Sequence, residues 1–238
     1  MNDEYGKVYL IPTTLGDNEP LEVLPLSVKK MVEQLQYFIV ENEKSARRFI
    51  KKISPKKSQS SLHLFVLDKY TDAYESKHFL DICFKGFNIG ILSEAGVPAI
   101  ADPGASIVKQ AHQLKLQVVP LVGPSSILLA MMASGMNGQN FAFNGYLPID
   151  TVERKAAIKG LENKSKELNQ TQVFIETPYR NEKMFTSLLQ NLTLTTQLCV
   201  ATDISLQTEY IRTMSVKEWK GQKIDLHKRP TIFILHKF

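Results

Sequence analysis

The sequence contains few of the residues that build metal sites or disulfide frameworks. Among its 238 residues are two cysteines, Cys83 and Cys199, each alone in an apolar stretch. There is no CxxC pair, and the five histidines show no metal-ligand spacing, so no metal centre is predicted. Isolated thiols in apolar surroundings are typical of a reducing compartment, and we expect a cytoplasmic location.

Common nucleotide-binding and nucleophile motifs are also missing. The chain has no GxGxxG, which disfavours an ordinary dinucleotide fold, and no GxxxxGK[ST], which excludes the phosphate-binding loop of that type. A GxSxG nucleophile elbow is excluded as well, because Ile127 stands where its last glycine would be.

Long apolar runs are absent. Residues 116–149 carry no charge, but Pro120, Gly123, Pro124 and Gly135 interrupt them, so about 20 continuous apolar residues are never available for a transmembrane helix. The N-terminus lacks the basic start and apolar core of a signal peptide. We therefore expect no membrane association.

The first half of the chain instead alternates strand-like and helix-like segments. Hydrophobic residues make up 43% and charged residues 22%, as in soluble globular proteins. Helices are predicted near residues 28–35, 44–52, 74–84 and 105–114, and strands at 8–11, 37–40, 62–67, 88–92 and 116–119. This alternation predicts a parallel sheet. Because ligands bind beyond the carboxyl ends of such strands, we expect functional residues just after these strands.

The second half predicts a different α/β domain. Helices are expected at residues 125–133, 151–168 and 181–192, and strands at 141–143, 173–175, 198–201, 209–213 and 231–236. The last three strands have little helix between them, which predicts a mixed sheet. We expect an N-terminal α/β domain over residues 1–121 and a C-terminal α/β domain over residues 122–238.

Three segments that follow predicted strands have the composition of ligand-binding loops. In residues 93–104 (SEAGVPAIADPG), glycines allow a ligand to approach the backbone and prolines fix the loop shape. Residues 120–126 (PLVGPSS) place a turn before a helix that Ser125 can cap. Residues 176–180 (ETPYR) combine a carboxylate, a turn and a guanidinium. Each segment also has a structural explanation. Residues 93–104 can be a plain turn, residues 120–126 can simply cap a helix, and Glu176 and Arg180 can form a surface ion pair.

Four blocks together resemble one known family. The segments SEAGVPAIADPG, VVPLVGPSS, FAFNGYLP and TQVFIETPYR are similar, in order and spacing, to the small-subunit ribosomal RNA methyltransferase I family of the tetrapyrrole methylase superfamily. The resemblance spans roughly residues 7–236. It implies a tetrapyrrole-methylase-like fold of two α/β domains, a homodimer, and S-adenosylmethionine in the cleft between the domains. It also implies 2′-O-methylation of a cytidine ribose in ribosomal RNA of the small subunit.

Carried over by position, the resemblance also implies a set of cofactor contacts. These contacts come from the first loop, the Gly/Pro-rich loop that meets the methionine part, the Gly-Pro-Ser block and two segments of the second domain. They are Pro12, Thr13, Gly96, Val97, Ile100, Ser125, Ser126, Thr177, Pro178, Pro230 and Thr231.

The resemblance is weaker at the polar residues beside the acceptor. Glu94 stands where family members usually have Asp, and the segment ENEK that begins at Glu41 stands in place of Glu-Asp-Thr-Arg. The segment TPYR that ends at Arg180 stands in place of Ser-Pro-His-Arg. The cofactor loops therefore match the family better than the acceptor side does.

Methyl transfer to a ribose hydroxyl requires a group that accepts the hydroxyl proton, so the predicted catalytic residues are mainly acids. The donor is already activated, so positioning supplies much of the acceleration, while a ribose hydroxyl needs a general base. The acids predicted at the cleft include Glu94, Glu41 and Glu176, and Glu94 ranks first because it lies in the best-matched loop. Asp102 also belongs to this group, although its neighbour Pro103 favours a turn role. Arg180 is expected to hold a phosphate or carboxylate.

A basic run provides the only other indication of RNA. With 29 basic and 24 acidic residues the net charge is +5, which permits an anionic partner without requiring one. Phosphate neutralisation and a solvated helix face both explain the run. Other acceptors stay open, namely a corrinoid or porphyrinoid ring or a protein side chain, as does a non-catalytic module that binds cofactor or RNA. The run consists of Lys44, Arg47, Arg48, Lys51, Lys52, Lys56 and Lys57.

Overall fold

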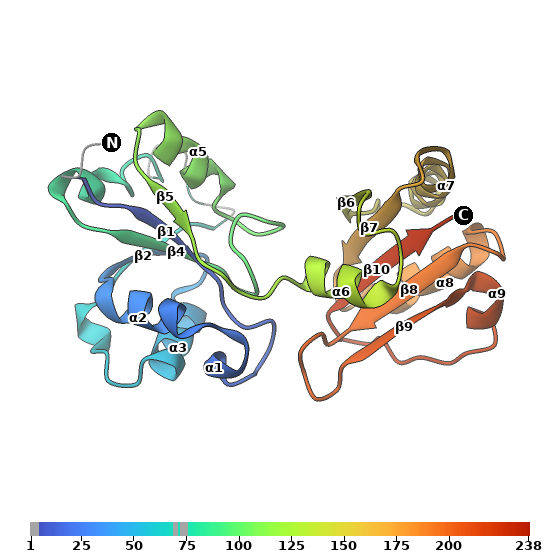
Figure 1. Cartoon of the computed structure of the whole chain (residues 1–238), viewed down its shortest axis with the longest axis horizontal. Coiled ribbons are helices and arrows are strands. Elements are labelled where there is room, and N and C mark those ends of the chain that lie inside the picture. The colour runs from blue at the N-terminus through green and yellow to red at the C-terminus, as the bar shows by residue number, and fades with distance from the viewer. Residues whose placement is uncertain (1–4, 69–70, 72–75) are drawn as a thin grey trace. The chain divides into compact units, whose positions relative to one another are not determined.

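The computed structural model describes residues 5–68, 71 and 76–238 (Figure 1). The chain divides into two compact units, Met1–Ser125 and Ser126–Phe238. Each unit is built on one five-stranded sheet, parallel in the first and mixed in the second. The predicted fold class is thereby confirmed. No helix in the described ranges is both long enough and apolar enough to cross a membrane.

In the first unit the carboxyl ends of all five strands lie along the same edge of the sheet. Its strands run in the order β3-β2-β4-β1-β5, and every neighbouring pair is parallel. The central strand β4 is buried along its whole length, because helices cover both faces of the sheet. The strands are β1 (Val8–Ile11), β2 (Tyr37–Val40), β3 (His63–Val66), β4 (Ile89–Leu92) and β5 (Val118–Pro120).

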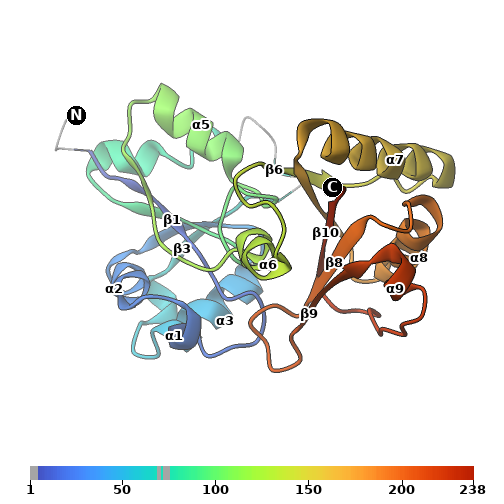
Figure 2. The same ribbon diagram turned by 45° about the vertical axis from the view of Figure 1, so that its right-hand side comes forward.

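Two apolar clusters, one on each face, hold the helices against this sheet. On one face α1 (Pro20–Val23), α2 (Leu26–Gln34) and α3 (Glu43–Ile53) bury side chains such as Val28 and Ile50. On the other face lie α5 (Ala105–Gln113) and the 3-10 helix η2 (Asp81–Lys85), with Ile107 and Cys83 buried (Figure 2). Along β2, Phe38 joins the first cluster and Ile39 the second, as strand alternation requires. A 3-10 turn, η1 (Gln59–Ser61), precedes β3.

In the second unit, antiparallel pairing places the start of β10 beside the ends of two other strands. The sheet order is β6-β7-β10-β8-β9, with β6 parallel to β7 and the other pairs antiparallel. Thr231 therefore lies opposite both Glu176 and Thr202. The strands are β6 (Phe141–Tyr146), β7 (Thr171–Glu176), β8 (Gln197–Thr202), β9 (Tyr210–Ser215) and β10 (Thr231–His236). The helices are α6 (Ser126–Ser134), α7 (Thr151–Leu168), α8 (Asn181–Asn191) and α9 (Val216–Trp219).

Some local predictions differ from the structure. The helix expected over 74–84 begins at residues that lie outside the described ranges, and its described part is a turn followed by η2. The strand expected from 116 starts at Val118, because the N–H of Leu116 donates to the carbonyl of Ala111 and closes the end of α5 instead. The short helices α1 and α9 were not predicted, although Pro20 begins α1 and Ser215 and Glu218 form a capping box at the start of α9.

Candidate functional site

The loops that follow β1, β4 and β5 pack against one another at the carboxyl edge of the parallel sheet. The N–H of Thr13 donates to the carbonyl of Gly96 over 2.9 Å. A β-carbon at Gly96 would lie 3.0 Å from Leu15 Cδ2 and 3.1 Å from the carbonyl oxygen of Pro124. Segments from three distant parts of the sequence thus meet at Gly96, whose missing side chain makes the approach possible.

The loop over residues 93–104 has an unusual backbone. Four of its residues have positive φ, at 76° for Gly96, 66° for Ala99, 55° for Ala101 and 119° for Gly104. The left-handed region disfavours alanine by about 1–2 kcal/mol, so the loop holds backbone strain. Strain of this kind concentrates at ligand-binding and catalytic segments. On the same loop Ile100 leaves 56% of its surface exposed, so an apolar side chain is available to a ligand.

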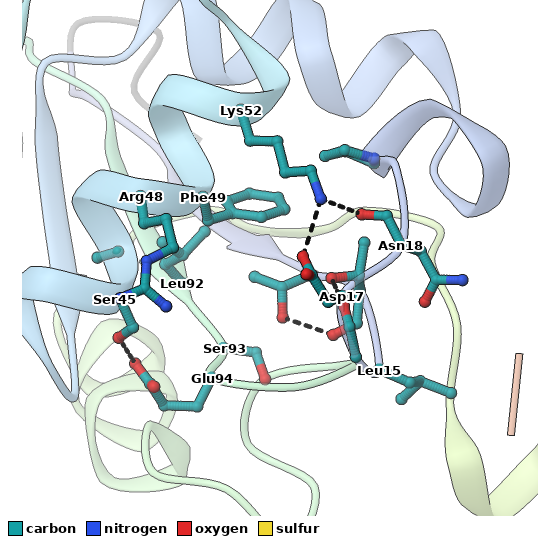
Figure 3. A pocket seen from close by; sticks show the side chains of 15 residues that line it. Leu15, Asp17, Asn18, Ser45, Arg48, Phe49, Lys52, Leu92, Ser93 and Glu94 are labelled. Carbon is teal, nitrogen blue, oxygen red and sulfur yellow. Dashed lines mark hydrogen bonds and ion pairs between the residues drawn. The ribbon is translucent and has the colours of Figure 1, made fainter. Parts of the chain in front are cut away.

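A pocket of about 410 Å³, called here the α3 pocket, opens between the loop after β1, the helix α3 and the end of β4 (Figure 3). Its helical wall consists of Ser45, Arg48, Phe49 and Lys52. These residues are three or four positions apart, so they share one face of α3. The side chain of Asn42 caps this helix by accepting hydrogen bonds from two backbone N–H groups, which fixes where the face begins.

Lys52 of α3 binds three residues of the loop after β1. Its Nζ lies 3.0 Å from Asp17 Oδ1, 2.9 Å from the carbonyl oxygen of Asn18 and 3.4 Å from Glu19 Oε1. The hydrogen bond from Lys52, with its positive charge, lowers the pKa of Asp17. Arg48 and Lys52, both members of the basic run, line the same pocket as Thr13.

Carboxylates gather on the other side of Glu94. A second pocket of about 640 Å³, called here the acidic pocket, is lined by Glu41, Asp68 and Glu94 at the ends of β2, β3 and β4. Burial, and then the charges of Glu94 and Asp68, raise the pKa of Glu41. Glu94 lines both pockets, and the hydroxyl of Ser45 donates to its Oε1 over 2.7 Å.

Asp102 belongs to the same electrostatic group. Burial, followed by the charges of Glu41 and Glu94, raises the pKa of Asp102 to about 6, against the opposing effect of a hydrogen bond from Ser93. The structure brings the predicted acids Glu94 and Glu41 together. No sequence motif indicated Asp68 specifically, although the position after the third strand was expected to be functional. Within the described ranges, no group of three His, Cys, Asp or Glu side chains could hold a metal ion.

The second unit has its own cluster where β7 ends and β10 begins. The carboxylate of Glu176, with 3% of its side chain exposed, accepts hydrogen bonds from Arg180 Nε at 2.9 Å, Arg180 Nη2 at 2.6 Å and the N–H of Thr177 at 2.6 Å. The ion pair considered from the sequence therefore exists, but on a buried carboxylate. The carbonyl of Pro178 accepts from the N–H of Lys228 over 3.1 Å, which joins this loop to the one before β10.

Comparison with known proteins places the chain. No family model matches it. It is 25% identical to ribosomal RNA small subunit methyltransferase I of Vibrio cholerae, over 96% of this chain and 76% of that protein, and 25% identical to the Buchnera aphidicola (subsp. Acyrthosiphon pisum) protein of the same name, over 100% and 82%. The solved methyltransferase CobJ superposes with a TM-score of 0.65 at 13% identity, covering 98% of this chain and 94% of that one. The precorrin-4 methyltransferase CbiF superposes with a TM-score of 0.60 at 15% identity, covering 97% and 94%.

The chain is a methyltransferase, and its fold is that of the solved methyltransferases CobJ and CbiF. The resemblance predicted from four sequence blocks is confirmed, and the protein is a divergent relative of ribosomal RNA small subunit methyltransferase I.

The predicted cofactor residues of this methyltransferase fall into groups by unit. In the first unit Thr13 and Gly96 are in contact, and Val97 and Ile100 follow on the strained loop. Ser125 and Ser126 lie in the sequence where the units join. In the second unit the four residues Thr177, Pro178, Pro230 and Thr231 gather where β7 ends and β10 begins, and the hydroxyl of Thr231 is buried and hydrogen-bonded to Thr202 at 3.0 Å.

Proposed function

We propose that this methyltransferase transfers the methyl group of S-adenosylmethionine to a ribose 2′-hydroxyl of small-subunit ribosomal RNA. The observation that supports this most is the meeting of the loops after β1, β4 and β5 around Gly96. These are the loops whose sequences resemble the cofactor loops of the family. The relatives from Vibrio cholerae and Buchnera aphidicola are named as ribosomal RNA methyltransferases, which supports the ribosomal RNA acceptor.

The residues present fit the cofactor. The loop over residues 93–104 offers apolar surface at Val97 and Ile100, which suits a ligand that is part nucleoside and part amino acid. We propose these residues, with Pro12, Thr13 and the contacts carried over in the second unit, as the binding set. Bound S-adenosylmethionine supplies a methyl group activated by its sulfonium sulfur.

We propose Glu94 as the general base. As the ribose oxygen takes the methyl group and the electron pair of the broken bond returns to sulfur, the hydroxyl proton passes to the carboxylate. Ser45 orients the Glu94 side chain through its 2.7 Å hydrogen bond. The neighbouring acids Glu41 and Asp102 have pKa values raised above the ordinary range, which adds proton acceptors stronger than a solvated carboxylate. Arg180, held by Glu176, is proposed to contact a phosphate.

Transfer of radiolabelled methyl groups to small ribosomal subunits from cells lacking the gene tests this function. Nucleoside mass spectrometry of the product should show a 2′-O-methylated ribose, and Glu94→Gln should slow transfer by about 100-fold or more. Glu22→Gln, which removes an exposed carboxylate from α1, is the matched control and should be unaffected. A base-methylated product would exclude ribose as the acceptor. Transfer to a porphyrinoid and to no ribosomal RNA would refute the proposal.

A further inference from the structure

The basic run divides into paired and unpaired members. Arg47 Nη2 lies 2.8 Å from Glu43 Oε1 and its Nη1 donates to the carbonyl of Gln59, while Lys52 is occupied by the loop after β1. Arg48 is exposed and forms no ion pair among the described residues. Lys51 donates to the backbone carbonyl of Pro55, and Lys57 donates to the backbone carbonyl of Glu33 in α2.

Of the two cations that line the α3 pocket, Arg48 is the one available to bind an anion. Lys52, the other cation of this pocket, is neutralised by Asp17. A guanidinium can form two parallel hydrogen bonds with a phosphate, which makes an uncommitted arginine in a pocket a phosphate-binding group.

Phe49 gives the pocket a surface for a base. Its half-buried ring follows Arg48 directly on α3 and lines the same pocket (Figure 3). Proteins that recognise unpaired nucleotides stack their bases on aromatic rings. The volume of about 410 Å³ lies within the range of small-molecule sites, roughly 300–1,000 Å³, and suits one nucleotide rather than a duplex.

Glu94 connects this surface with the chemistry. It lines the α3 pocket at the end of β4, so a nucleotide that fills the pocket reaches the proposed base. We propose that the α3 pocket binds a single, unpaired nucleotide of the RNA acceptor, with Arg48 on its phosphate and Phe49 against its base. This inference rests on the proposed function and specifies which part of the substrate the first unit holds.

Titration of the full chain with cytidine 5′-monophosphate, monitored by heteronuclear NMR, tests whether the α3 pocket binds a nucleotide. A pyrimidine nucleotide is used so that its binding is not confused with binding of an adenine base at the cofactor site. The nucleotide should bind more tightly than cytidine, by about 10- to 100-fold, because of the charged phosphate contact. Arg48→Ala should abolish that advantage and Arg48→Lys should keep part of it, while Phe49→Leu should weaken cytidine itself. Lys51→Ala removes the same charge from α3 outside the pocket and should have no effect.

Three results would overturn the inference: equal binding of cytidine and its monophosphate, undiminished binding in Arg48→Ala, or displacement of the nucleotide by S-adenosylhomocysteine. The last result would identify the pocket as part of the cofactor site. Failure of the proposed function is distinguishable. Arg48-dependent nucleotide binding without transfer to ribosomal RNA refutes the acceptor, whereas transfer that Arg48→Ala leaves unchanged refutes the pocket.

Discussion

Replacement of Asp102 by asparagine tests the electrostatics at the carboxyl edge of the parallel sheet. The pKa of Asp102 is about 6, chiefly because of burial, against an ordinary value of 3.8. Since the folded pKa lies above the unfolded one, folding favours the neutral form. The stability that this provides is fully present below about pH 4 and is lost as the pH rises through about 6. Asparagine is neutral at every pH and can still accept hydrogen bonds.

The size of the effect follows from the two pKa values. A tenfold change in acid dissociation corresponds to about 1.4 kcal/mol, so the difference between 3.8 and about 6 gives an upper limit of about 3 kcal/mol. Asp102 is only half-buried, and solvent screening reduces this to about 1–2 kcal/mol. We expect Asp102→Asn and the wild type to be equally stable near pH 4, and the variant to be more stable by that amount at pH 8.

The assay can separate the two units. Trp219, the single tryptophan, is fully buried in the second unit, so its fluorescence follows that unit, whereas far-ultraviolet circular dichroism follows both. Urea unfolding should show the gain in the dichroism transition at pH 8 and none at pH 4, with the fluorescence transition as the control. A variant that is no more stable than wild type at pH 8, or equally stabilised at both pH values, would refute the reasoning.

Two further substitutions test the packing of the candidate site. Gly96→Val should lower the free energy of unfolding by about 1–3 kcal/mol, because φ of 76° strains a β-branched residue and the side chain would crowd Leu15 and Pro124. Urea unfolding measures this loss, and we expect a smaller loss for Gly96→Ala. Glu176→Gln should destabilise the second unit by about 2–3 kcal/mol because it leaves Arg180 without its carboxylate. Trp219 fluorescence should report that loss, and the double variant Glu176→Gln/Arg180→Met should recover part of it; an unchanged transition in Glu176→Gln would contradict a structural ion pair.

Local sequence signals predicted the elements whose ends are chemically marked. The bounds of β1, β2, α7 and β10 agree with the prediction residue by residue. At α7, Asp150 caps the first turn by accepting from the N–H groups of Val152 and Glu153, and Asn169 ends the helix in a left-handed conformation. Such signals lie within a few residues of the boundary, so the sequence alone carries them.

The candidate site was less predictable because it depends on contacts between distant residues. Lys52 and Asp17 are 35 positions apart, and nothing near either residue indicates the pair. Asp102 was expected to serve a turn because Pro103 follows it. Its raised pKa arises from burial and from charges on other strands, which no local pattern contains. Glycine predicted the close approach at Gly96, but the neighbours that fill the space, Leu15 and Pro124, belong to the protein itself.

The distribution of charge around Glu94 supports the proposed ribose acceptor. A phosphate is stabilised by cations and repelled by carboxylates, whereas a hydroxyl that must lose its proton needs a carboxylate nearby. Both demands are compatible only if the two kinds of side chain approach the nucleotide from different directions. Here Arg48 of α3 lines the α3 pocket, while Glu41 and Asp68, which follow β2 and β3, line the acidic pocket. Glu94 lines both pockets, so the proposed base is the group at which the phosphate-binding and proton-accepting surfaces meet.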